Sequence, residues 1–164
     1  MSKDGNATES FGKLPPWALP YNGWTWKERM AVVPIQQAAL RRGEIKPPSK
    51  CRICGFEPTA NARRPRRMIM HTERYDCPLE YLPLCQSCHA ALHARFRDPH
   101  RWFALLARCE GGPEWAKILT MDPDSATRPF DETYPPALRS IIIDAALRSG
   151  DNGPASERGA LHLL

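Results

Sequence analysis

The chain has 164 residues, a formal net charge of +5 and a mean hydropathy of −0.50. No run of 18 apolar residues occurs, and the first residues carry no apolar signal region, so we expect a cytoplasmic protein without a membrane partner. The length suits one modest domain with flexible ends, or a small domain with added helices.

The positive charge is concentrated in one part of the chain. Residues 41–101 hold 13 Lys and Arg against 6 Asp and Glu, whereas the remainder holds 10 against 12. Because each contact between a cation and a phosphate releases condensed counterions, such a segment favours a nucleic acid, DNA in the first place, as partner. The alternative is that these residues only keep a small domain soluble.

The N-terminal part predicts an arm followed by helices. Residues 1–22 are rich in Gly, Pro and polar residues and predict a flexible arm with two aromatic side chains able to dock on the body, Trp17 and Tyr21. Residues 23–46 show helical spacing of apolar residues. Pro34 removes a backbone donor within this segment, so we expect two short helices on either side of it, the second stopped by Gly43.

Two Cys-x-x-Cys pairs define the next segment, residues 47–98. They are Cys51/Cys54 and Cys85/Cys88, separated by 30 residues. Thiolates two residues apart in a tight turn can bind one ion, and two such turns supply the four ligands of a tetrahedral zinc. The alternative for either pair is chance spacing or a redox dithiol. Two pairs with the same spacing favour a structural Zn²⁺.

The stretch between the pairs contains a dense run of arginines. Arginine forms bidentate contacts with phosphate, and Pro65 stiffens the run, so these side chains are candidates for binding nucleic acid. A solvated loop is the alternative. The candidates are Arg63, Arg64, Arg66 and Arg67, extended by Arg74.

Three histidines are candidates for a second metal site. His71 ends a strand-like apolar run, and His89 and His93 lie four residues apart on a helix expected over residues 87–96, so their imidazoles project from one face. Three imidazoles leave coordination positions open for a phosphate oxygen and water, so Mg²⁺, Mn²⁺, Ni²⁺ or a second Zn²⁺ is a possible catalytic ion. The alternatives are a spare ligand or a hydrogen-bond partner of the zinc turn for His89 and a half-buried helical residue for His93.

The C-terminal part, residues 99–149, predicts helices over 99–108, 114–120 and 136–149, and residues 150–164 predict a flexible tail. The first of these helices should be capped at Asp98 and should bury Trp102, Phe103, Leu105 and Leu106. Tryptophans 24, 26 and 102 are interpreted as core residues. Because these helices are less basic than the preceding segment, they are the expected contact for a protein partner.

The motifs resemble the zinc-knuckle branch of the HNH endonucleases over about residues 51–96. The matching elements are Cys51-x-x-Cys54-Gly, then His71 with Tyr75, Pro78 and Leu79, and then Leu84-Cys85-x-x-Cys88-His89-x-x-x-His93. The resemblance implies an α+β fold, in which a small ββα-metal module is embedded in mostly α-helical surroundings.

In this family one histidine of a pair binds the divalent metal and the other is the general base that activates water. The resemblance places His71 at the first position and Thr72 at the second, and a threonine hydroxyl cannot act as a base near neutral pH. Glu80 stands nearest to the family's asparagine. His71 is therefore a candidate base or metal ligand, and Glu73, the nearest carboxylate, is a candidate base or ligand.

Three functions follow as hypotheses. The first is a metal-dependent endonuclease that hydrolyses phosphodiester bonds in DNA. The second is an HNH-like zinc module that binds nucleic acid without cleaving it, which the threonine at position 72 favours. The third is a zinc-stabilised adaptor that binds another protein through its C-terminal helices.

Overall fold

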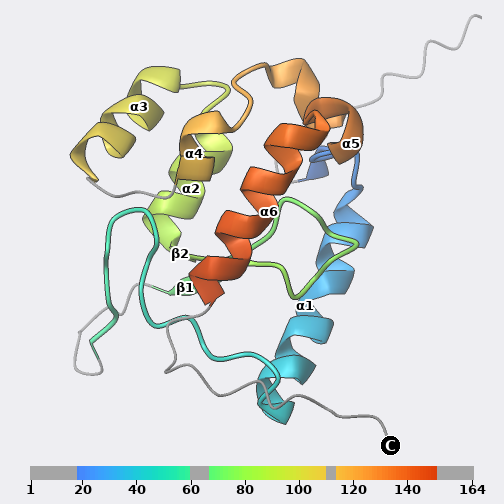
Figure 1. The fold of residues 1–164 in the computed structure, drawn as a ribbon, viewed down its shortest axis with the longest axis vertical. Helices are drawn as coiled ribbons and strands as arrows, with labels where there is room; N and C mark the ends of the chain where they lie inside the picture. The colour runs from blue at the N-terminus through green and yellow to red at the C-terminus, as the bar shows by residue number, and fades with distance from the viewer. Residues whose placement is uncertain (1–17, 60–66, 110–113, 151–164) are drawn as a thin grey trace, which may run out of the picture.

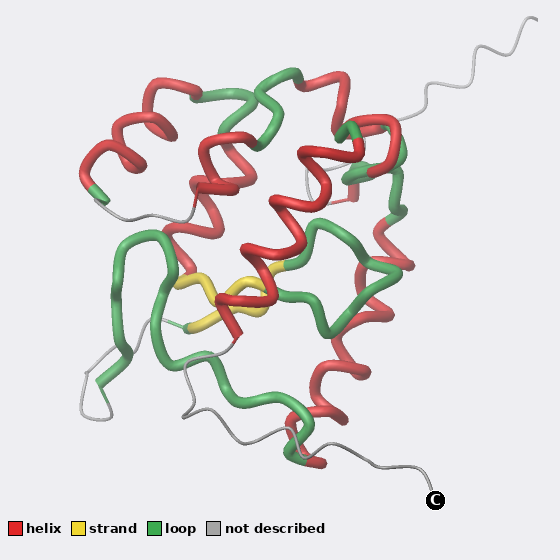
Figure 2. The backbone as a smooth tube through the Cα atoms, in the orientation of Figure 1, coloured by secondary structure: helices red, strands yellow, loops and turns green. Residues whose placement is uncertain are grey.

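The structure is a computed structural model that describes residues 18–59, 67–109 and 114–150, without the side chains of residues 149 and 150 (Figure 1). Helices surround a two-stranded antiparallel sheet, so the fold is α+β as expected, and Figure 2 shows the two strands near the middle of the molecule. None of the helices within these ranges combines the length and apolar composition that crossing a bilayer requires.

The first helix, α1, spans Trp26–Arg42 without interruption, which corrects the expectation of two helices. Thr25 and Glu28 form a reciprocal capping box at its N-terminus, and Gly43 ends it in the left-handed conformation at φ 74°. Pro34 lies inside the helix, where it removes one hydrogen-bond donor. The caps and the buried face of the helix offset this loss.

A β-hairpin and the helix after it form the centre of the molecule. Strand β1, Met68–His71, pairs antiparallel with β2, Leu82–Cys85, and α2, Gln86–Ala94, begins directly after β2. The register places Met68 opposite Cys85 and His71 opposite Leu82. The last cysteine of the hairpin and His71 therefore lie at opposite ends of the sheet.

Helix α2 packs along this hairpin and connects its two ends. It contacts both strands, and its rise from Cys85 to His93 is about 12 Å. The three steps of β2 from Cys85 back to Leu82 cover about 10 Å. The C-terminal half of α2 therefore reaches the end of the hairpin where His71 lies.

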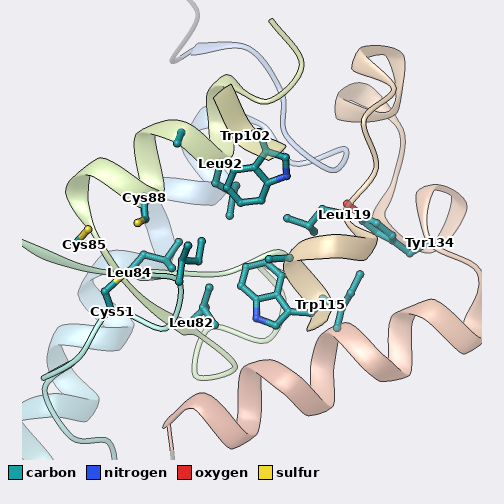
Figure 3. Close-up of a cluster of buried hydrophobic side chains, with 14 of the residues drawn as sticks. Cys51, Leu82, Leu84, Cys85, Cys88, Leu92, Trp102, Trp115, Leu119 and Tyr134 are labelled. Atoms are coloured by element: carbon teal, nitrogen blue, oxygen red, sulfur yellow. The ribbon is translucent and has the colours of Figure 1, made fainter. Parts of the chain in front are cut away.

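The remaining elements cover the hairpin and complete the core. Trp102, Trp115 and Leu92 are almost fully buried in this core, next to Leu82 and Leu84 of β2 (Figure 3). Helix α6 crosses in front of the sheet in Figure 1 and contacts β2. These elements are α3 (Pro99–Arg108), α4 (Glu114–Ile118), the 3-10 helix η2 (Pro123–Thr127), α5 (Phe130–Thr133) and α6 (Pro136–Gly150).

Two aromatic residues expected in the core are exposed. Phe103 is 52% exposed, because the buried face of α3 is formed by Trp102 and the half-buried pair one turn later, and Phe103 lies about 100° away from that face. Trp26 is 39% exposed and is covered on one side by the guanidinium of Arg29. The 3-10 helix and α5 were not expected.

The expected N-terminal arm divides into two parts. Residues 1–17, including Trp17, lie outside the described residues. Tyr21 does dock on the body, as anticipated, and both Tyr21 and Asn22 are buried. Asn22 adopts a positive φ of 50°, and with Gly23 it forms a turn that returns the chain to Trp24 through paired backbone hydrogen bonds. Residues 18–24 therefore form a strap across the body rather than a free arm.

Candidate metal centres

The four expected cysteines converge at one end of the hairpin. Their sulfurs all lie within 4.8 Å of one another, and the Sγ atoms of Cys54 and Cys85 are 3.7 Å apart. A tetrahedral zinc with Zn–S bonds of about 2.3 Å places its sulfurs about 3.8 Å apart. The thiols therefore fit one zinc ion, and their convergence confirms the expected pairing of the two turns.

Local structure explains how the first cysteine turn is held. The amide of Gly55 donates to the carbonyl of Cys51 at 2.8 Å, and Gly55 has a φ of 69° that a glycine adopts without strain. The amide of Arg52 donates to the carbonyl of Pro83, which ties the turn to β2. The second pair is placed by the junction of β2 and α2, because Cys85 ends the strand and Cys88 lies in the first helical turn.

Three of the four thiols are buried, and Cys54 is exposed. A hydrogen bond from Cys88, assisted by neighbouring backbone amides, lowers the pKa of Cys51 although burial acts in the opposite direction. Burial raises the pKa of Cys54, and the hydrogen bond with Cys51 together with burial raises that of Cys88. The thiolate form is therefore favoured at Cys51 and disfavoured at Cys54 and Cys88. Figure 3 shows that Cys51, Cys85 and Cys88 border the hydrophobic core, so an ion here would tie the two turns to that core.

Three histidines converge at the other end of the hairpin, as expected. One ligand nitrogen from each of His71, His89 and His93 lies within 4.8 Å of the others. The Nε2 atoms of His89 and His93 are 3.1 Å apart. The centroid of the His71 ring lies 5.2 Å from that of His89 and 5.1 Å from that of His93. Two nitrogens bound to one ion at about 2.1 Å are separated by roughly 3.0–3.4 Å, so this pair fits a shared ion.

The electrostatic environment keeps the helical histidines neutral. Burial, followed by the proximity of His71, lowers the pKa of His89 to about 3. The same causes lower the pKa of His93 well below its ordinary value. A neutral imidazole has a lone pair to give to a metal, so this site favours the ligand form near neutral pH.

A buried carboxylate, Glu73, holds His71 in place. Its Oε1 lies 2.8 Å from Nε2 of His71, and it accepts hydrogen bonds from Tyr21 at 2.7 Å and Asn22 at 2.7 Å. Burial alone would raise the pKa of Glu73, but His71, Arg95 and Tyr21 bring it down to about 2. Because the ionised carboxylate only accepts hydrogen bonds, Nε2 of His71 donates to it, and Nδ1 is the nitrogen left to bind an ion.

The strap of residues 18–24 closes over this cluster. The ring of Tyr21 packs edge-on against His93 with centroids 4.8 Å apart, and its hydroxyl donates to Glu73 while accepting from Arg95 at 3.2 Å. Arg95 is fully buried and also donates to the carbonyl of Thr120. A chain of contacts thus connects the N-terminal strap, the hairpin and the C-terminal half of the core.

Thr72 has a structural role in the turn after β1. Its hydroxyl donates to the carbonyl of Arg74 at 2.8 Å and accepts from the amide of the same residue at 3.2 Å. Both functions of the hydroxyl are used in this turn, so Thr72 does not serve as a base. Glu73, a candidate base or ligand, is engaged with the side chains of Tyr21, Asn22 and His71, and it orients His71.

The expected nucleic-acid-binding arginines are only partly described. Arg63, Arg64 and Arg66 lie outside the described residues. Arg67 is exposed, and its carbonyl accepts from Gln86, which places it beside the second cysteine turn. Arg74 forms a two-point ion pair with Asp76, at 3.0 Å and 2.7 Å.

Sequence reasoning missed the roles of Asn22 and Arg95, and foresaw for Tyr21 only that it docks. Their partners lie 51, 52 and 74 residues away along the chain, so no local pattern indicates these contacts. A turn signal, Asn22-Gly23, is the only local hint that the strap bends there.

No family model, curated protein or solved structure matches this chain. The two candidate metal centres therefore rest on their own geometry alone.

Proposed function

We propose that the chain is an HNH-like, metal-dependent nuclease that hydrolyses phosphodiester bonds in DNA. The observation that carries the proposal is the convergence of His71, His89 and His93 from a strand and the helix behind it. The strand–strand–helix order, the adjoining four-thiol cluster and the basic segment over residues 41–101 support it. The sequence resemblance to HNH endonucleases points to the same activity.

The chain's own residues have distinct roles in this proposal. His71, His89 and His93 would hold a divalent ion, and such an ion supplies open positions for water and a phosphate oxygen together with stabilisation of negative charge. Glu73 fixes the orientation of His71 through the 2.8 Å contact with its Nε2. The four cysteines would hold a structural zinc that keeps the hairpin and α2 together.

A slow reaction is expected. Thr72 and Glu73 are both engaged in other hydrogen bonds, and the described residues contain no further carboxylate or imidazole placed as a free base among the three histidines. Loss of a positioned general base costs about 10²–10⁴ in rate. We therefore expect nicking to need long incubations and a high ratio of enzyme to DNA.

The test is cleavage of supercoiled plasmid by the full chain with Mg²⁺, Mn²⁺, Ni²⁺ or Zn²⁺. We expect nicking with at least one ion, and a loss of at least about 100-fold in His89→Ala and His93→Ala, because each removes a ligand. His100→Ala is the matched control, since this histidine on α3 lies outside the cluster. Plasmid left intact by the wild type under every metal would refute the proposal.

The second candidate is an HNH-like module that binds nucleic acid without cleaving it. The hydrogen-bonded hydroxyl of Thr72 favours it, because the position of the family's base is occupied by a residue with a structural role. This candidate predicts salt-sensitive DNA binding by metal-loaded protein with no nicking. If the protein neither binds nor cleaves nucleic acid at low salt, both candidates are refuted and the protein-binding adaptor becomes the favoured hypothesis.

A further inference from the structure

A groove of about 630 Å³ separates the first cysteine turn from the end of α3. One wall is formed by residues 50–55 and the other by residues 107–109. Figure 1 shows how this arises, because the loop after α1 rises beside α2 toward α3. None of the lining residues belongs to the three-histidine cluster, so the groove is distinct from the proposed catalytic centre.

The charge of the groove is positive. Lys50 and Arg52 come from the cysteine turn and Arg108 from the last turn of α3, while the described lining includes no acidic residue. Lys50 pairs with Glu57 at 3.1 Å, but these side chains are 51% and 63% exposed. Water and salt screen such a pair, so Lys50 can exchange it for another anion. Three cations facing one space favour an anionic ligand.

The form of the groove suits a segment of polyanionic chain. Its volume lies within the range of ligand sites, about 300–1,000 Å³. A groove of this size holds a segment of one chain but not a whole duplex. The turn is open on this side, because a side chain added at Gly55 would meet only the flexible end of Lys50 at 3.9 Å. Three more arginines follow the turn in the sequence, at positions 63, 64 and 66, outside the described residues.

A competing demand for the same cations exists within the protein. Four thiolates around one Zn²⁺ leave a net charge of −2, and Cys51 and Cys54 line the groove. The cations could serve only to neutralise that cluster. An experiment can separate the two roles. If the cations neutralise the thiolates, their removal should weaken zinc retention. If they bind a ligand, their removal should weaken the affinity for an added anion.

We propose that this groove binds the phosphodiester backbone of a nucleic acid, with Lys50, Arg52 and Arg108 contacting its phosphates. The assignment rests on the proposed function for the identity of the ligand. It adds a binding surface that is separate from the metal centre and that includes α3, a part of the chain outside the sequence resemblance. The strand held here would lie away from the bond that is cut.

The test compares two double variants with the same change in net charge. Lys50→Gln/Arg108→Gln removes two groove cations, and Arg101→Gln/Lys117→Gln removes two exposed cations on α3 and α4 outside the groove. Arg52 is left unchanged because it lies inside the first cysteine turn, between Cys51 and Cys54. The affinity of the zinc-loaded full chain for a labelled single strand of about 16 nucleotides and the matching duplex is measured by anisotropy at salt concentrations from about 50 to about 200 mM.

We expect the groove variant to bind both probes more weakly. Because it no longer neutralises two phosphates, the slope of log affinity against log salt should fall by about 2 for the duplex and by about 1.4 for the single strand. The control variant should keep the wild-type slope. Arg108→Gln alone, which leaves the cysteine turn unaltered, should reduce the slope by about 1. Zinc content, measured on the same samples, should stay at the wild-type level.

Two results would overturn the inference. Equal slopes in the groove and control variants would show that the groove does not contact phosphate. Loss of zinc from the groove variant with unchanged affinity in its zinc-loaded fraction would assign the cations to the thiolates.

Plasmid nicking separates this inference from the proposed function. A wild type that binds but never nicks, with a weakened groove variant, would refute the nuclease and retain the groove. A nicking wild type whose groove variant binds like the control would refute the groove and retain the nuclease.

Discussion

Glu73 is the residue on which the geometry of the three-histidine cluster depends. A buried carboxylate is costly unless it is hydrogen-bonded, and this one is satisfied by Tyr21, Asn22 and His71. Its contact with Nε2 of His71 fixes the tautomer and leaves Nδ1 available as a ligand. Such a partner of a metal-binding histidine tunes affinity without touching the ion.

At this scale we predict that Glu73→Gln weakens divalent metal binding by about 10–100-fold, the usual cost of losing an outer partner of a ligand. Glutamine keeps the size of the side chain but removes the negative charge that His71 faces. The measurement is a calorimetric titration of Ni²⁺ or Co²⁺ into protein whose thiol cluster is already filled with zinc.

The matched control is Tyr75→Phe. Tyr75 lies beside Tyr21 with ring centroids 6.4 Å apart, and its hydroxyl forms a hydrogen bond with Arg29. We expect this variant to bind the ion like the wild type. Equal affinities in Glu73→Gln and Tyr75→Phe would show that the carboxylate does not tune the site.

Among the elements, α2 connects the two candidate centres. Cys88 in its first turn faces the thiol cluster, and His89 and His93 face the histidine cluster. A helix that begins at the last residue of a strand and packs back along the hairpin brings ligands to both ends of the sheet. A shift of α2 along the strands would therefore disturb both sites together.

Helix α1 contains a proline, Pro34, in its interior. Proline inside a helix costs about 3 kcal/mol relative to alanine, because it removes a hydrogen-bond donor and its ring clashes with the preceding turn. We expect Pro34→Ala to raise the free energy of unfolding by about 3 kcal/mol, because Pro34 is exposed and its side chain fills no core position.

Urea unfolding of zinc-loaded protein, followed by circular dichroism, measures this change. Gln37→Ala, at an exposed position of the same helix, should alter the free energy by less than about 0.5 kcal/mol. An unchanged or lower stability in Pro34→Ala would mean that the proline ring makes a stabilising contact of its own.

For the whole molecule, the two candidate centres differ in their contribution to the stability of the fold. The thiol cluster adjoins the core of Leu82, Leu84 and Leu92. The histidine cluster is instead held by a network of hydrogen bonds centred on Glu73. Binding of a structural zinc releases about 10–16 kcal/mol, which is comparable to the whole stability of a domain, about 5–15 kcal/mol. Removal of that ion should unfold the protein.

We therefore expect two divalent ions per chain when the protein is loaded, measured by elemental analysis. His93→Ala should lose one ion and keep its circular dichroism spectrum, while Cys88→Ser should lose its zinc and most of its cooperative unfolding. Arg97→Gln, an exposed change just after α2, serves as the control and should keep both ions. Two ions retained in His93→Ala would contradict the assignment of the second site.

Local patterns were sufficient for several features. The spacing of the cysteines and of His89 and His93 predicted both clusters, because turns and helices place residues close in sequence on one side of the chain. Asp98 and Pro99 marked the start of α3 correctly, since capping is a local interaction. The exposure of Phe103 was not predicted, because apolar composition alone does not say which side of a helix faces the core.

The sequence by itself determined the two cysteine turns, the pairing of His89 with His93 on one helix face, the start of α3 and the basic segment, all of which depend on residues close together in the chain. Only the tertiary structure decided that Tyr21 and Asn22 close over Glu73, that Thr72 serves a turn, and that α3 forms a groove with the first cysteine turn. The contacts of Tyr21 and Asn22 with Glu73 join residues 52 and 51 positions apart in the chain. Their formation depends on how the core packs, and that is a property of the whole chain rather than of any local pattern.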